Sequence, residues 1–468
     1  MDSNILIKEQ CGSVGNIIAY ASSGRNEIIC INPKRTITAP IHFILHFLRE
    51  VLLPYGYPES VSEDYLEYQL WDTAQAFCST ITGAFTTRAV LKGVGVGDSE
   101  ATALSAAITW IMKEGTGMLG RIIFAWWKGS GLDSDCKKWR LFADILNDVA
   151  MSIELLLPFI GAFSMQILCV TSVMKSIVGI AGGATRASIT NHQAIKNNMA
   201  EISAKDGTQE TVVNLVASIA SIYLLNIFNG TFSEWIFIFS LMALHLLTNY
   251  WAVKSLIFRN LNDQRLAIVL RTYLTVGTIM NPKKTNEKEV VILGFGRKVS
   301  DFCGFKIVMG MSLKKVLHTM AAAEFLQTLA LYKTKNYFLI VDISNGTIYI
   351  SFEKGEYPES VIAAYFHAVV LGIATCIYNG MDLDIYSKRQ LHHRTPITRL
   401  YTFMKSFDKS STYQNIPYEH LVDFEEFLKK EYSMFHTALQ LNDWVLTSHA
   451  LNVGEWRTEW KSYDKKLN

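Results

Sequence analysis

Long uncharged runs alternate with short polar segments in the middle of this 468-residue sequence. Three of the runs cover Leu155–Met174, Thr211–Ser233 and Trp235–Val253. Each is close to the ~20 apolar residues that an α-helix needs to cross the hydrocarbon layer of a membrane. The pattern therefore predicts an integral, multi-pass membrane protein with membrane lipids as its surroundings.

Nearly all the charge between these runs lies in one polar cassette, Arg186–Glu210. The second and third runs are typical of a helical hairpin that turns at Asn229-Gly230, with basic residues only on its outer flanks. By the positive-inside rule the turn faces away from the cytosol, and the C-terminal part of the chain is cytosolic. Basic residues on both sides of Leu155–Met174 leave two alternatives for that run, a transmembrane span or a re-entrant or buried helix.

The pattern divides the chain into four parts and predicts a mainly α fold. Residues 1–56 form a leader with strand-forming segments and a helix, and residues 57–280 form a helical domain that is partly embedded in the membrane. A polar linker at 281–289 leads to a smaller α+β domain at 290–468. The predicted strands of that domain are Val290–Leu293, Phe305–Met309, Tyr337–Ile343 and Thr347–Phe352.

Two features of the C-terminal part carry further expectations. Asn345-Gly346 between the last two predicted strands is a strong hairpin signal. Val361–Tyr378 is uncharged for 18 residues, yet it is rich in alanine and lies among strands. We therefore interpret it as a buried core helix, with a membrane span as the alternative.

The segment Trp139–Glu154 is strongly amphipathic. At 100° per residue, Arg140, Asp144 and Asp148 fall on one arc, and apolar side chains fill the opposite face. In lipid, such ionisable residues would hold a cation or a transported proton. On a surface, Arg140 and Asp144 would be an ordinary ion pair one turn apart. The sequence favours the surface or interfacial alternative.

Composition agrees with partial embedding and excludes other classes. Charged residues make up 18% of the chain, against roughly 25% in soluble proteins. A net charge of +2 provides no basic field, so we expect no nucleic-acid partner. The seven cysteines are scattered without a C-x-x-C pair, which argues against a disulfide framework or a structural zinc site and favours a reducing compartment.

Catalytic motifs are weak. Gly115–Gly120 matches G-x-G-x-x-G, but Lys113-Glu114 separate it from the only candidate strand, Ile108–Met112. A dinucleotide site needs the strand to run directly into the glycines. We therefore interpret the glycines as a helix break or a close packing contact. No catalytic residue, cofactor or metal site is predicted, and an enzyme is the less favoured class.

The cassette is the best candidate for ligand binding, because hydrogen-bonding side chains are concentrated there. A solvated connecting helix is the plainer interpretation of the same residues. Together with the polar arc of Trp139–Glu154, the cassette could form one ligand-binding surface. The candidate residues are Arg140, Asp144, Asp148, Arg186, His192, Lys196, Asn198 and Lys205.

Six sequence blocks between Tyr57 and Arg271 resemble the RUS (root UV-B sensitive) family. They begin at Tyr68 (YQLWD), Lys113 (KEGTGMLGR), Phe124 (FAWWK), Trp139 (WRLFADILND), Gly182 (GGATR) and Ser203 (SAKD, followed by QET). The resemblance implies a membrane-associated protein whose plant members are linked to UV-B-sensitive root growth and vitamin B6 status. It implies no established enzyme activity and hence no catalytic residues to transfer.

Two hypotheses on function follow. The first is a membrane protein that binds or transports a small polar or anionic metabolite. The alternative is a non-catalytic membrane scaffold whose C-terminal domain binds a protein partner, either a homologous RUS protein or a second copy of itself. A soluble cofactor-binding enzyme comes third. An endomembrane is the favoured location.

Overall fold

The computed structural model describes residues 5–10, 17–22, 28–31, 39–95, 103–160, 163–228, 232–317, 320–355, 357–387, 395–407 and 414–460. The chain forms two compact units. The first comprises Met1–Leu132 and Cys136–Leu256, and the second comprises Asp133–Asp135 and Ile257–Asn468. The predicted class, mainly α with a smaller α+β C-terminal part, is confirmed.

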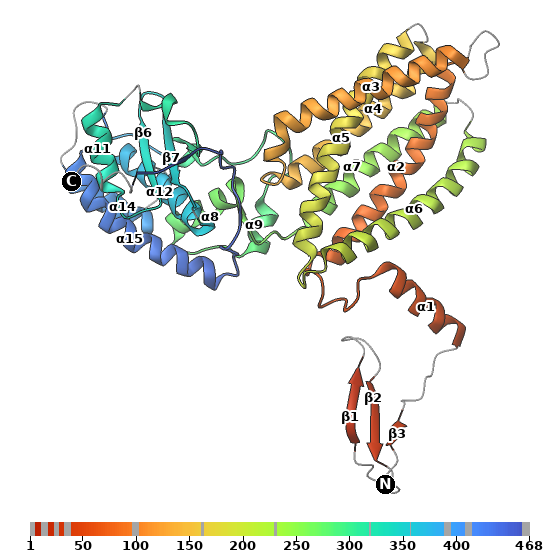
Figure 1. Ribbon diagram of the computed structural model, residues 1–468, viewed down its shortest axis with the longest axis horizontal. Helices are drawn as coiled ribbons and strands as arrows, with labels where there is room; N and C mark the ends of the chain where they lie inside the picture. The colour runs from red at the N-terminus through yellow and green to blue at the C-terminus, as the bar shows by residue number, and fades with distance from the viewer. Residues whose placement is uncertain are drawn as a thin grey trace. The chain divides into compact units, whose positions relative to one another are not determined.

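The first unit is dominated by long helices that run alongside one another (Figure 1). α2 packs against α6, α7 and α4, while α5 packs against α3, α4 and α6. The helices are α2 (Tyr65–Gly93), α3 (Ala103–Lys128), α4 (Cys136–Leu155), α5 (Ser164–Gln193), α6 (Met199–Ile227) and α7 (Phe232–Ser255).

The predicted strand-forming leader is present as a small antiparallel sheet in the order β1-β2-β3. Its strands are β1 (Ile5–Gln10), β2 (Ile17–Ser22) and β3 (Ile28–Ile31), and the helix α1 (Ala39–Leu52) follows. The hairpin turn expected at Asn229-Gly230 lies outside the described residues.

Four described helices are long and apolar enough to cross a membrane, namely α5, α6, α7 and α12 (Pro358–Tyr378). In α5, α6 and α7, only 28%, 11% and 39% of the apolar window is buried, whereas 89% is buried in α12. The first three helices therefore present apolar surface to their surroundings, as lipid contact requires. α12 is instead surrounded by protein, which confirms the prediction of a core helix.

The run Leu155–Met174 is not one helix. α4 ends at Leu155, a 3₁₀ turn (η2) covers Leu157–Phe159, and α5 begins at Ser164. Pro158 in that turn lacks an N–H and cannot continue the α-helical hydrogen bonds. The candidate span is therefore α5, which includes part of the charged cassette.

The glycines at 115–120 lie inside the continuous helix α3, where Gly117 and Gly120 face α5. A Cβ added at Gly117 would lie 2.5 Å from Ser172 Oγ, and one at Gly120 would lie 2.9 Å from Val173 Cγ1. The motif thus permits close helix packing, as small residues do in membrane bundles. Residues 108–112, the candidate strand of a dinucleotide site, are helical.

The second unit is built on a sheet in the order β5-β7-β6, with β7 also pairing with β9. β7 is parallel to β5 and β9 and antiparallel to β6, with which it forms the hairpin predicted at Asn345-Gly346. The strands are β5 (Lys306–Met309), β6 (Tyr337–Asp342), β7 (Thr347–Glu353) and β9 (Arg457–Thr458). β4 (Leu261–Asn262) pairs separately with β8 (His449–Ala450).

Helices cover this sheet, and α12 lies at the centre of the hydrophobic core. Phe366, Val369 and Ile373 of α12 are completely buried. The other helices of the unit are α8 (Asp263–Val276), α9 (Pro282–Lys288), α10 (Ser300–Cys303), α11 (Ala322–Leu331), α13 (Asp384–Ser387), α14 (Pro396–Lys405) and α15 (Tyr418–Leu441).

One expectation for the region around residue 285 needs correction. The predicted polar linker, residues 281–289, contains helix α9, and the side-chain amide of Asn286 pairs with both backbone groups of Phe258 at 3.2 and 2.9 Å. Val290–Leu293 is not a strand. The side-chain amide of Gln264 bonds the N–H and carbonyl of Val290, in place of a neighbouring strand. The two compact units divide earlier, between Leu256 and Ile257.

Candidate functional site in the helical bundle

The polar arc of α4 faces the interior of the first unit. Asp148 is 5% exposed, and Arg140 and Asp144 reach side chains of α2. Ile145 and Val149, on the apolar face, are 38% and 45% exposed. The surface interpretation of this arc is therefore wrong. The helix is turned so that its charges lie among other helices and its apolar face points outward.

One half of the interior network joins α2, α4 and α7. Gln75 Nε2 lies 2.8 Å from Asp144 Oδ2 and 3.0 Å from His245 Nε2. His245 Nδ1 lies 2.9 Å from Asp148 Oδ2, and Asn249 donates to Asp144. Gln75 therefore connects Asp144 with His245, and His245 connects in turn with Asp148.

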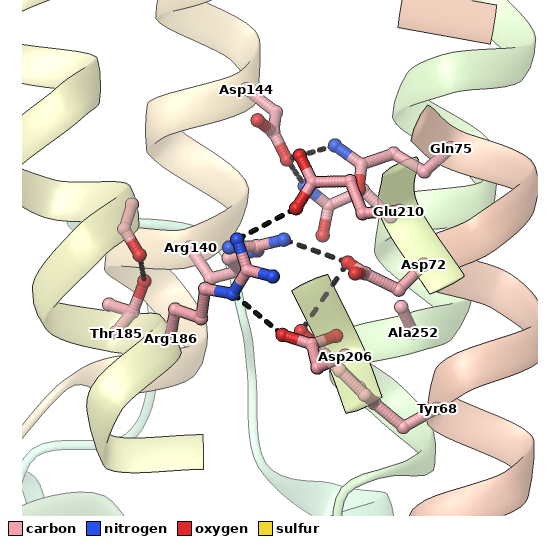
Figure 2. A network of polar contacts seen from close by, with 12 residues as sticks. Tyr68, Asp72, Gln75, Arg140, Asp144, Thr185, Arg186, Asp206, Glu210 and Ala252 are labelled. Carbon is pink, nitrogen blue, oxygen red and sulfur yellow. Dashed lines mark hydrogen bonds and ion pairs between the residues drawn. The ribbon is translucent and has the colours of Figure 1, made fainter. Parts of the chain in front are cut away.

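The other half of the network is centred on two arginines. Arg140 Nη2 of α4 lies 2.7 Å from Asp72 Oδ1 of α2. Arg186 of α5 binds two carboxylates of α6, Asp206 at 2.6 Å and Glu210 at 2.7 Å. Figure 2 shows both guanidinium groups directed into the same space, with these carboxylates around them. Arg186 of the cassette and the arc of α4 thus lie on one polar network.

Acids outnumber bases in this interior network. Its two arginines face five carboxylates, those of Asp72, Asp144, Asp148, Asp206 and Glu210. Because each arginine is already in contact with at least one carboxylate, the guanidinium groups are largely neutralised. The network therefore has no surplus positive charge with which to attract an anion.

Three buried atoms of the network lack a hydrogen-bond partner within the described part of the chain. They are Asp148 Oδ1, Asn249 Oδ1 and Arg140 Nε. Buried polar atoms are almost always hydrogen-bonded, and unpaired ones commonly mark a water or ligand position. Two acceptors and one donor are thus available to a polar molecule inside the bundle.

The remaining predicted residues do not enter this interior. His192 of α5 lies 2.8 Å from Asp64, and Lys205 donates to the carbonyl of Glu50. Lys196 and Asn198 lie in the turn between α5 and α6, where the Lys196 N–H donates to Asn198 Oδ1 at 3.3 Å. His192 and Lys205 bind residues that precede α2, namely Asp64 and Glu50. Lys196 and Asn198 stabilise the α5–α6 turn. The eight candidates therefore divide into four residues of the interior network and four that lie outside it.

Sequence reasoning missed Gln75, His245 and Asn249. The sequence held a signal for the last two, since His245 and Asn249 lie one turn apart in an uncharged, largely apolar run. In the structure each is 1% exposed. Polar residues at that spacing on an apolar helix mark an inward stripe. Across the described ranges, no cluster of three or more His, Cys, Asp or Glu side chains could hold a metal ion.

The first unit is a helical bundle with apolar outward faces and a charged interior, and an α+β unit follows it in the chain. This organisation is typical of a multi-helix, membrane-associated protein. The chain belongs to the root UVB sensitive (RUS) family. A model described as "Vitamin B6 photo-protection and homoeostasis domain" matches residues 41–277, and one for the root UVB sensitive C-terminal region matches residues 278–460. The resemblance seen in the sequence is thereby confirmed, and these models meet close to the predicted domain boundary.

Two relatives illustrate the relationship. RUS family member 1 of Dictyostelium discoideum is 41% identical over 293 residues, which cover 62% of this chain but only 55% of that protein. Protein root UVB sensitive 3 of Arabidopsis thaliana is 33% identical over 335 residues, or 70% of this chain and 76% of the relative. No solved structure matches the chain.

Proposed function

We propose that the first unit is embedded in a membrane and binds a small polar metabolite in the interior network. The observation that carries this proposal is the placement of Arg140, Asp144 and Asp148 inside a bundle whose outward faces are apolar. Ionisable groups inside a membrane bundle are costly, so they are functional candidates by default. Helix packing alone therefore does not account for the three charged side chains of the polar arc.

The network favours a neutral polar ligand with hydrogen-bond donors over an anionic one. The arginines are occupied by carboxylates, while Asp148 Oδ1 and Asn249 Oδ1 are free to accept. A ligand with hydroxyl or N–H groups would satisfy these acceptors. The family model that matches this unit is described as a vitamin B6 photo-protection and homoeostasis domain. We therefore infer that hydroxyl-bearing B6 vitamers are the first compounds to test.

The orientation proposed for the chain places its C-terminal unit in the cytosol of a cell, with the bundle in an endomembrane. The basic residues Lys254 and Arg259 at the end of α7 support this orientation through the positive-inside rule. Alkaline carbonate extraction of cell membranes tests the embedding itself. Retention in the pellet is expected, and release into the supernatant would contradict it.

A thermal-stability screen of the detergent-purified protein against polar metabolites, including B6 vitamers, tests binding. A ligand that binds only the native state at 100 times its Kd stabilises the protein by about 2.7 kcal/mol. We expect a neutral, donor-rich compound to raise the midpoint of thermal unfolding. If no compound does so, the scaffold alternative gains support, and co-purification of a protein partner with the C-terminal unit becomes its test.

Transport is the further possibility within this proposal, and it is tested separately from binding. Reconstituted proteoliposomes would take up a bound, labelled ligand faster than protein-free vesicles if the ligand crosses. Binding without uptake would restrict the function to sensing or storage of the ligand.

A further inference from the structure

The core of the second unit contains a cluster of ionisable side chains that the interior network of the first unit does not involve. Lys335 lies between α11 and β6, and its ammonium group contacts Glu425 of α15. His367 of α12 lies between them, with Nδ1 3.5 Å from Lys335 Nζ and Nε2 3.1 Å from Glu425 Oε1. An amine, an imidazole and a carboxylate therefore meet at one point.

Two tyrosines enclose this cluster. The hydroxyl of Tyr332 lies 3.3 Å from His367 Nε2, and that of Tyr337 lies 3.4 Å from His367 Nδ1. Lys335 Nζ lies over both rings, 5.4 and 5.5 Å from their centroids. The amine is thus held between two aromatic faces, in a setting that suits a flat, conjugated group attached to it.

Lys335 can be reached from solvent, and its partners are less exposed. Its side chain is 24% exposed, whereas those of His367 and Glu425 are 1% and 16% exposed. A buried ion pair with no other role adds little to stability, since the loss of hydration offsets the attraction of the charges. The amine of Lys335 is also surrounded by the polar side chains of His367, Tyr332 and Tyr337. A structural ion pair with Glu425 would not require these three side chains.

A cavity of about 70 Å³ adjoins the cluster. Tyr332 forms part of its wall, together with Leu371, one turn after His367, and Leu421, one turn before Glu425. The volume is several times the ~10–15 Å³ that one water molecule needs. The cavity reaches the cluster only through Tyr332 among the described residues, whereas Lys335, His367 and Glu425 do not line it, so a group bound to Lys335 would extend toward solvent.

Burial brings the pKa values of Lys335 and Glu425 closer together. Burial lowers the pKa of Lys335 and raises that of Glu425, in each case against the attraction of the partner. Both changes favour transfer of the proton from the ammonium group to the carboxylate. The transfer leaves a neutral amine, which is the nucleophilic form of lysine.

We propose that Lys335 is a reactive lysine that forms a reversible imine with a small aromatic aldehyde, assisted by Glu425 and His367. The neutral amine adds to the aldehyde carbon, so that a C–N bond forms as the C=O π bond breaks, and His367 passes the proton from the nitrogen to the oxygen to give a carbinolamine. The carboxyl group of Glu425 returns its proton to the carbinolamine hydroxyl, which leaves as water. The net change is one ammonium ion and one aldehyde giving one protonated imine and one water.

Reductive trapping on the intact protein tests the proposal. Full-length protein is incubated with benzaldehyde and sodium cyanoborohydride at pH 7, and benzylated lysines are mapped by peptide mass spectrometry. Lys333, two residues away and exposed, is the matched control. Each unit by which a lysine pKa falls raises its neutral fraction about tenfold. Because burial lowers the pKa of Lys335, we expect severalfold faster labelling at Lys335 than at Lys333.

Two variants separate a reactive site from simple exposure. Lys335→Arg keeps the positive charge and should abolish labelling at position 335 without changing labelling at Lys333. Glu425→Gln removes the carboxyl group that returns the proton to the carbinolamine hydroxyl and should slow labelling at Lys335, even though loss of the carboxylate also lowers the pKa of the amine, with Lys333 again unchanged. Labelling of Lys335 no faster than Lys333 would overturn the proposal, and this wild-type comparison holds even if a variant is unstable. Equal labelling in folded Glu425→Gln would also overturn it.

Discussion

His245 Nδ1 of α7 lies 2.9 Å from Asp148 Oδ2 of α4, and both side chains are buried inside the helical bundle. Gln75 approaches the other nitrogen of the same ring, so the imidazole connects α2, α4 and α7 in one hydrogen-bonded chain. The arrangement fixes the direction in which Asp148 points, and it leaves Oδ1 of that carboxylate without a partner among the described residues.

Replacing His245 by Leu should destabilise the first unit. The change leaves Asp148 buried without its hydrogen bond, which costs about 1–3 kcal/mol. The free energy of unfolding in detergent, measured with denaturant, checks this. The double variant His245→Leu with Asp148→Leu removes both partners and should recover part of the loss. A single variant as stable as the wild type would show that the contact does not hold α4 and α7 together.

Substitution of Gly117 by Ala should weaken the packing of α3 on α5. The new Cβ would lie 2.5 Å from Ser172 Oγ, and overpacking of this kind costs typically ~1–3 kcal/mol. Gly115→Ala is the control, because no atom lies within 4 Å of its added Cβ. That variant should gain up to ~1 kcal/mol from better helix propensity. Thermal unfolding midpoints that move in the same direction for both variants would refute the packing role.

Removal of the Glu289 side chain by substitution with Ala should strongly destabilise the second unit. Glu289 accepts from Arg265 at 2.9 and 3.1 Å, and the two side chains are 3% and 4% exposed. Breaking one side of a buried pair costs about 3–5 kcal/mol. The exposed pair of Lys354 and Glu459 provides the control, since Glu459→Ala should cost at most ~1 kcal/mol. Calorimetry that finds equal losses of stability in Glu289→Ala and Glu459→Ala would contradict the expected effect of burial.

The hairpin turn between β6 and β7 should lose stability in acid. Burial alone would raise the pKa of Asp342, but hydrogen bonds from Asn345 and Ser344 outweigh it, and the pKa lies below its ordinary value. The contribution of the carboxylate is therefore complete above the ordinary pKa of about 3.9 and is lost as the pH falls through the folded-state value. Unfolding midpoints between pH 5 and 2 should fall more steeply for wild type than for Asp342→Asn. Parallel curves would exclude this turn as a source of acid sensitivity.

The elements of the second unit that depend on local pattern were predictable. Asn345-Gly346 between two β-rich segments identified the β6–β7 hairpin, and alanine-rich apolar residues among strands identified α12 as a core helix. Val290–Leu293 has the composition of a strand but no neighbouring strand with which to pair. Val290, the first residue of this segment, instead forms hydrogen bonds with the side chain of Gln264. The local sequence does not encode that contact.

The candidate site was only half predictable, for a physical reason. Helical periodicity identifies the two faces of α4 but not which face is buried, because in lipid the polar face turns inward. Gln75 and His245 meet across 170 positions of sequence, a contact that no local pattern encodes. The sequence predicts one surface for the whole cassette. In the structure, Arg186 lies within α5 and contacts Asp206 of α6, whereas Lys196 lies in the α5–α6 turn.

The shift in thermal unfolding that a B6 vitamer such as pyridoxine produces in matched variants tests the account most directly. Asp148→Asn changes the buried carboxylate of the interior network, whereas Glu67→Gln changes an exposed carboxylate on α2. If the interior network binds this vitamer, pyridoxine will stabilise the wild type and Glu67→Gln equally and fail to stabilise folded Asp148→Asn. Equal stabilisation of all three proteins, or of none, would contradict binding of this vitamer in the polar interior.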